Sequence, residues 1–139
     1  MAADMKATLR QQSERKRPYW GLTADIKGAH QLVAVRPEDW PLIACQLEAG
    51  GDVFLNKVGA FGGSSVFYWW SRLVAAAHRT GLLVVYPEWP LWALLFADDL
   101  ELSAEGPTYC HAILCFLWWL VVLGFPCSWL KTHGGFTYS

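Results

Sequence analysis

Two adjacent aspartates interrupt the apolar segment LWALLFADDLELSA, residues 91–104. The apolar stretches on both sides are long enough for strands, and Asp is well tolerated in tight turns. The segment therefore predicts an antiparallel hairpin, with its turn at Asp98 and Asp99 and a return strand over 100–104. Because neighbouring like charges repel and no Lys or Arg lies nearby in the sequence, a bound cation is an alternative reason for the pair.

The segment 112–130 covers 19 residues without a charge, which is close to the length of a membrane-spanning helix. Gly124 and Pro126 interrupt the run, so a helix that begins at Pro107 is expected to end near Leu123. The helical part of the run is then about a dozen residues, too few for the roughly 20 that a bilayer requires. A buried helix followed by an extended segment at 125–132 is favoured, with a small membrane-anchored protein as an alternative.

The composition indicates one folded domain. Of 139 residues, 54% are apolar and 17% are charged, which argues against a disordered chain. Nine tryptophans predict an aromatic-rich core, or surface that a missing neighbour covers. The four cysteines form no CxxC pair, which favours reduced thiols and an intracellular protein in the cytoplasm or nucleus.

The charges are unevenly distributed along the chain. Residues 1–36 hold seven of the 11 Lys and Arg, although the net charge of the whole chain is −1. Residues 1–20 are therefore predicted to form a basic, polar and poorly ordered leader ahead of a folded domain at 21–139. Such a leader suits a polyanionic partner, or it keeps an apolar domain in solution.

The remaining elements follow from periodicity and turn residues. We expect β-compatible pieces in 22–35, a turn or short helical start at 37–41, and a hairpin around Gly50, Gly51 and Asp52. A helix capped by Ser64 or Ser65 is expected to end at Gly81, and 82–88 is expected to be a strand. The order of strand, hairpin, helix, hairpin, helix and strand predicts an α+β fold. In that fold an antiparallel sheet carries two helices on one face, as in a split βαβ arrangement.

This arrangement brings carboxylates together. Asp25 ends an early strand that can lie beside the hairpin carrying Asp98 and Asp99. Three carboxylates at one sheet edge repel unless cations neutralise them, and Mg²⁺ prefers such oxygen ligands. A pair of Mg²⁺ ions, with Mn²⁺ as a substitute, would support phosphoryl transfer.

Four segments in this order resemble the palm of a reverse transcriptase, most closely those of Gypsy/DIRS-like retrotransposons. They are ADIKGAHQLVAV at 24–35, VGAFGGSSVFYWWSRL at 58–73, FADD at 96–99 and LGFPCSWLKT at 123–132. The resemblance covers residues 20–135. It leaves no chain for the fingers and thumb of that family.

The resemblance implies roles for individual residues. Asp25, Asp98 and Asp99 correspond to the carboxylates that bind metal, and Ile26 corresponds to the residue whose carbonyl assists. Lys131 corresponds to a lysine near the departing pyrophosphate. Contacts with template and incoming nucleotide are implied for the positions matching the second motif and for the residue five after the first Asp: Phe61, Gly62, Ser65 and His30.

The implied activity is RNA-directed DNA polymerisation. A primer 3′-hydroxyl would attack a deoxynucleoside triphosphate on an RNA or DNA template, with magnesium bound by the palm. Because positioning dominates phosphoryl transfer, a fragment without fingers and thumb is expected to be weak or inactive alone, and to require those or other polyprotein domains as partners. The alternative is a non-catalytic remnant of a retroelement, in which the carboxylates are only turn residues.

Overall fold

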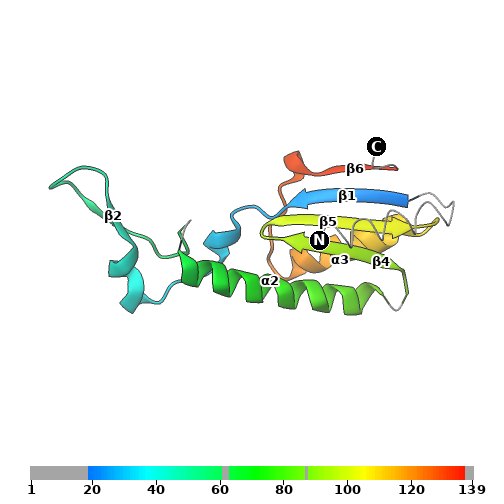
Figure 1. Ribbon diagram of the computed structural model, residues 1–139, viewed down its shortest axis with the longest axis horizontal. Coiled ribbons are helices and arrows are strands. Elements are labelled where there is room, and N and C mark those ends of the chain that lie inside the picture. Colours follow the sequence, from blue (N-terminus) through cyan, green and yellow to red (C-terminus); the bar gives the residue numbers. More distant parts are fainter. Residues whose placement is uncertain (1–18, 61–62, 87, 137–139) are drawn as a thin grey trace.

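The computed structural model describes residues 19–60, 63–86 and 88–136. They form an α+β domain with a four-stranded antiparallel sheet in the order β4-β5-β1-β6 (Figure 1). The strands are β1 (Tyr19–Asp25), β4 (Leu91–Phe96), β5 (Asp99–Glu105) and β6 (His133–Gly135). The predicted α+β class, the antiparallel sheet and the coarse order of strand, hairpin, helix, hairpin, helix and strand are confirmed. Residues 1–18 of the predicted leader lie outside the described residues, and its last two residues, Tyr19 and Trp20, belong to β1.

Two helices pack on one face of this sheet, α2 (Ser64–Val85) and α3 (Tyr109–Val122). Figure 1 shows α3 behind the sheet and α2 beside β4. Side chains alternate along the strands, so Leu22 and Leu102 are buried under the helices whereas Thr23 is exposed on the other face. One face of the sheet therefore builds the core, and the opposite face holds the polar residues.

The helix α2 begins at Ser64 with Gly63 as its N-cap and no side-chain capping hydrogen bond, so the predicted cap at Ser64 or Ser65 is wrong by one or two residues. It continues past Gly81 to Val85, so the predicted helix end at Gly81 and the predicted strand at 82–88 are wrong. The reason is tertiary: a Cβ at Gly81 would lie 2.8 Å from Cε2 of Phe116 in α3. Glycine allows the helices to approach here, and the buried stripe of α2 runs on beyond it: Val66, Trp70, Val74, Ala77, Gly81 and Val85.

The second predicted helix is confirmed as α3, which ends just before Gly124, a residue with φ of 84°. Within the described residues, no helix is both long and apolar enough to cross a bilayer. The segment expected to be extended at 125–132 contains a single bridge between Cys127 and Ile26, followed by the short helix η3 (Trp129–Lys131). The prediction of an extended segment is therefore only partly correct.

The segment between β1 and α2 carries a projecting arm. The short helices η1 (Ala29–Leu32) and η2 (Pro37–Ile43) precede a hairpin of β2 (Ala44–Gln46) and β3 (Val53–Leu55). The hairpin and the short helix at Pro37 are as predicted, whereas the β-compatible stretch 22–35 is a strand only to Asp25. Figure 1 shows that β2 lies well away from the sheet.

Candidate functional site

Asp25 and Asp99 face each other across the central strands of the sheet. They are register partners at the ends of β1 and β5. The next pair along this ladder, Ile26 and Asp98, is hydrogen-bonded, with 2.8 Å from the Ile26 N–H to the Asp98 carbonyl. Because hydrogen-bonded and non-hydrogen-bonded pairs alternate, Asp25 and Asp99 form a non-hydrogen-bonded pair, whose side chains lie closer together. The fold therefore holds two carboxylates side by side.

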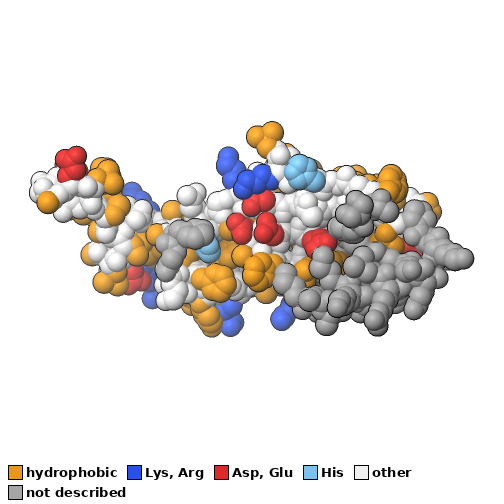
Figure 2. Space-filling model, turned by 45° about the horizontal axis from the view of Figure 1, so that its top comes forward, with side chains coloured by type: hydrophobic (Ala, Val, Ile, Leu, Met, Phe, Trp, Pro, Cys, Tyr) orange, Lys and Arg blue, Asp and Glu red, His pale blue; other side chains and the backbone are white. Residues whose placement is uncertain are grey.

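These carboxylates line a hollow on the sheet face opposite α2 and α3. The hollow has a volume of about 400 Å³, and its polar lining includes Asp25, Asp99, Glu101 and Lys131. We call these four residues the acidic site. Figure 2 shows acidic side chains gathered beside Lys or Arg side chains in the middle of the face turned toward the reader.

Lys131 provides the positive charge of the acidic site. Its Nζ lies 3.3 Å from Oδ2 of Asp25, in an ion pair in which the lysine side chain is 68% exposed and the aspartate 17%. Two facing carboxylates in a sheet repel, so this ammonium offsets part of the repulsion. Lys131 ends the short helix η3, and the residue before that helix, Ser128, donates its N–H to the Asp25 carbonyl. This bond holds Lys131 near Asp25.

The turn that carries Asp98 is fixed from two sides. The indole Nε1 of the buried Trp70 donates to the carbonyl of Ala97 at 3.0 Å, and Ile26 donates to the carbonyl of Asp98. These bonds place the two-residue loop at Ala97 and Asp98, so the predicted turn at Asp98 and Asp99 is wrong by one residue. Asp99 instead begins β5, where it pairs with both Phe96 and Asp25.

Ala97 adopts a strained backbone conformation in that loop. Its φ of 56° is the only positive φ of a non-glycine residue in the described part of the chain. A left-handed conformation costs an L-residue roughly 1–2 kcal/mol, and strained residues of this kind concentrate at functional sites. The neighbouring Asp98 is half-buried and does not line the hollow with Asp25.

The positions predicted to contact nucleotide and template lie away from the acidic site. His30 is half-buried in η1, with its ring 6.5 Å from the rings of both Phe67 and Trp70. Ser65 lies in the first turn of α2 and lines a different cavity from that of the acidic site. The predicted positions Phe61 and Gly62 lie outside the described residues.

Sequence reasoning overlooked Glu101. Residues two apart on a strand share a face. A strand that begins at Asp99 therefore also carries Glu101 on that face, where Glu101 is the register partner of Thr23 in β1. The sequence signal was the alternation of apolar and polar residues after Asp99, in Leu100, Glu101, Leu102 and Ser103. The predicted strand begins at Leu100, one residue later than β5, and therefore leaves out Asp99.

The carboxylate oxygens of the acidic site are the type of donor atom that a hard divalent cation prefers. Carboxylate oxygens are ligands that Mg²⁺ accepts, whereas Ile26, whose carbonyl was predicted to assist, does not line the hollow. In the portion of the chain that the structure describes, however, no three His, Cys, Asp or Glu side chains are gathered closely enough to hold a metal ion. Burial raises the pKa of the Cys127 thiol, which favours its neutral form.

Comparison with models of known protein families finds no match for this chain, and no curated protein is significantly similar to it. The geometry of the acidic site is therefore the observation on which its function must be argued.

Proposed function

We propose that the chain is a palm-type fragment of an RNA-directed DNA polymerase that keeps a divalent-cation site at Asp25, Asp98 and Asp99. The observation that supports this proposal is the facing pair of Asp25 and Asp99 at the end of the central strands, beside Lys131. A fold has no structural need to place two carboxylates opposite each other, where they repel. A cation bound between them would remove that cost.

Each residue has a defined part in the proposed chemistry. Asp25 and Asp99 would bind the cation from neighbouring strands, and Asp98, which does not line the hollow in this structure, would join them if its turn rearranges when the cation binds. Bound Mg²⁺ would supply the charge that activates a primer hydroxyl and stabilises a leaving oxyanion. Lys131, once released from Asp25, would present its ammonium to the pyrophosphate of a deoxynucleoside triphosphate.

Primer extension tests this activity. The full chain is incubated with poly(rA)/oligo(dT), thymidine triphosphate and Mg²⁺ or Mn²⁺, and the products are resolved on a sequencing gel. We expect addition of only a few nucleotides, because the described residues form one small domain and positioning of the duplex dominates phosphoryl transfer. This addition should disappear in Asp25→Asn and Asp99→Asn and persist in Asp52→Asn, a matched exposed acid in the arm. Robust extension that Asp25→Asn leaves unchanged would exclude both the site and the mechanism.

A second candidate function is a non-catalytic remnant of such a polymerase. The observation that favours it is the ion pair of Lys131 with Asp25, because an internal cation already neutralises part of the site. A remnant would show neither primer extension nor divalent-cation binding that depends on Asp25. The two candidates therefore differ in a binding measurement as well as in activity.

A further inference from the structure

A second cavity lies between the start of α2 and the segment that follows η1. It has a volume of about 620 Å³, within the roughly 300–1,000 Å³ typical of small-molecule sites. Its walls are mainly apolar, formed by Val66, Trp69 and Leu73 of α2 and by Leu32 and Val33 on the other side. We call this cavity the Trp69 pocket. None of its lining residues belongs to the acidic site.

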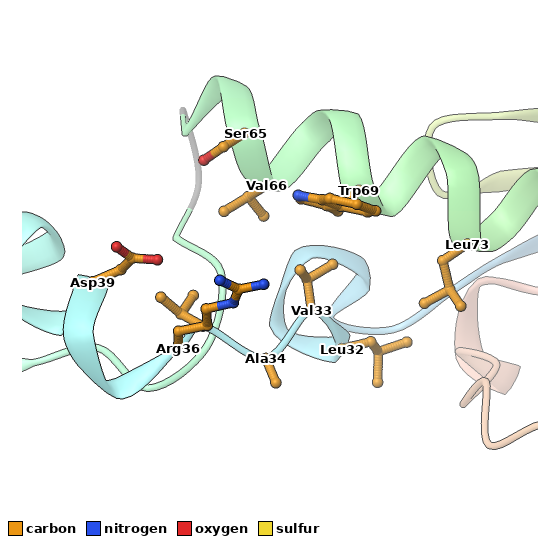
Figure 3. Close-up of a pocket in the computed structure, with 10 residues that line it drawn as sticks. Leu32, Val33, Ala34, Arg36, Asp39, Ser65, Val66, Trp69 and Leu73 are labelled. Atoms are coloured by element: carbon orange, nitrogen blue, oxygen red, sulfur yellow. The ribbon is translucent and has the colours of Figure 1, made fainter.

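The aromatic wall of the pocket is available to a ligand. Trp69 is 58% exposed, although it is a large apolar residue. Its indole N–H donates no hydrogen bond to any residue that the structure describes, and its ring contacts that of Tyr68 edge-on at 5.4 Å. Figure 3 shows the Trp69 ring edge-on across the cavity from Val33. A flat group entering the pocket can therefore stack on the indole.

Opposite charges stand at the polar end of the pocket. Figure 3 shows the Arg36 side chain reaching into the cavity between Asp39 and Trp69. Both charged residues are exposed, and among the described residues neither forms an ion pair. Arg36 offers several N–H donors and Asp39 offers acceptor oxygens. The rim is thus neutral overall and suits a ligand that carries both acceptors and donors.

We propose that the Trp69 pocket binds an unpaired nucleobase, which stacks on Trp69 while its edge bonds to Arg36 and Asp39. Guanine has the required edge, with the O6 acceptor beside the N1–H and N2–H donors, and arginine commonly donates to O6. Stacking of bases on aromatic side chains gives binding with little sequence preference. Ser65, for which the resemblance implies a contact with template or nucleotide, also lines the pocket, so the proposal extends the proposed function; it needs no metal and can be tested apart from the acidic site.

Nuclear magnetic resonance tests the proposal on the full ¹⁵N-labelled chain. Guanosine 5′-monophosphate is titrated in the presence of EDTA, which removes divalent cations from the acidic site. We expect the indole N–H signal of Trp69 and the side-chain N–H signal of Arg36 to shift together. Trp69→Leu and Arg36→Ala should each weaken binding roughly fivefold or more. Asp25→Asn should bind the nucleotide as the wild type does, which separates this test from that of the acidic site.

Matched variants and competing ligands complete the experiment. Trp118→Leu and Arg79→Ala remove an exposed tryptophan and an exposed arginine outside the pocket, and binding should be unchanged. If inorganic phosphate alone reproduces the shifts, the pocket is an anion site and the proposal is wrong. Tighter binding of L-tryptophan would overturn it in favour of a zwitterion site. Unaltered affinity in Arg36→Ala, a change of an exposed side chain that the fold tolerates, would also overturn it.

Discussion

At the residue scale, the facing carboxylates of Asp25 and Asp99 are the feature with the largest electrostatic cost. Opposed like charges in a sheet destabilise by roughly 0.2–1 kcal/mol, and the exposed Lys131 compensates only partly, because water screens its charge. This cost belongs to the cation-free protein. A bound divalent cation would convert it into a gain in stability.

We therefore expect Asp99→Asn to raise the free energy of unfolding by about 0.5 kcal/mol when EDTA is present. The same substitution should abolish the stabilisation that Mn²⁺ gives the wild type. Urea denaturation with EDTA or Mn²⁺ measures both effects, with Asp52→Asn as the control that changes neither. A loss of stability in EDTA would contradict our description of the pair.

Ala97 offers an independent test of the turn. Glycine adopts positive φ without the penalty that alanine pays, but it loses more entropy on folding. The balance predicts that Ala97→Gly raises the free energy of unfolding by about 0.5 kcal/mol. Thermal unfolding followed by circular dichroism provides the measurement. Marked destabilisation would show that the alanine side chain, rather than the backbone conformation, is what the turn requires.

The candidate site was predictable from local patterns only in part. Asp25 at a strand end and the adjacent Asp98 and Asp99 after an apolar run were visible in the sequence. Their pairing was not, because the turn is held by Trp70, 27 residues from Ala97 in the chain. A shift of one residue in the turn decided that Asp99, rather than Asp98, faces Asp25.

At the element scale, the close packing of α2 against α3 depends on Gly81. Trp119 reinforces the same contact, since its Nε1 donates to the Ala77 carbonyl at 3.2 Å. The predicted helix end at Gly81 followed from the usual role of glycine after a helix. Gly81 lies inside α2 because α3 packs closely against it. The end of α2 could therefore not be predicted from the local sequence around Gly81.

Gly81→Ala should therefore lower the free energy of unfolding by about 1–3 kcal/mol, the usual cost of overpacking. The new Cβ would lie 2.8 Å from the ring of Phe116, which is fully buried and has no room to move. This outcome runs against helix propensity, which favours alanine by about 1 kcal/mol. Chemical denaturation measures the change.

Gly135→Ala is the matched control for that substitution. No atom lies within 4 Å of a Cβ built at Gly135, so this variant should be neutral or slightly stabilising. If Gly81→Ala stabilised the protein as much as Gly135→Ala, the close approach of the two helices would be wrong.

At the scale of the whole molecule, the chain divides into a packed body and an exposed arm. The six residues of β2 and β3 are all exposed, and a lone two-stranded hairpin is marginally stable. The central strands β1 and β5 lie inside the sheet and cover the core. The hairpin of β2 and β3 and the sheet with its two helices were predictable, because each carries its own turn and periodicity signals. The position of this hairpin away from the sheet was not predicted.

Hydrogen exchange should distinguish the body from the arm. Amides of β2 and β3 are expected to exchange at least roughly a hundredfold faster than those of β1 and β5, since local opening of the arm exposes little apolar surface. Mass spectrometry of peptic peptides measures the rates. Equal protection of the arm and the central strands would mean that the arm packs against the body in solution.

The central claim is that Asp25 and its neighbours bind a divalent cation, and calorimetric titration of the full chain with Mn²⁺ tests it most directly. The account predicts binding that Asp25→Asn and Asp99→Asn each weaken at least roughly tenfold, an effect that even outer-shell contacts to a metal reach. Binding to Asp52→Asn should equal that of the wild type. Absence of binding to the wild-type chain, or binding that Asp25→Asn leaves unchanged, would contradict the claim.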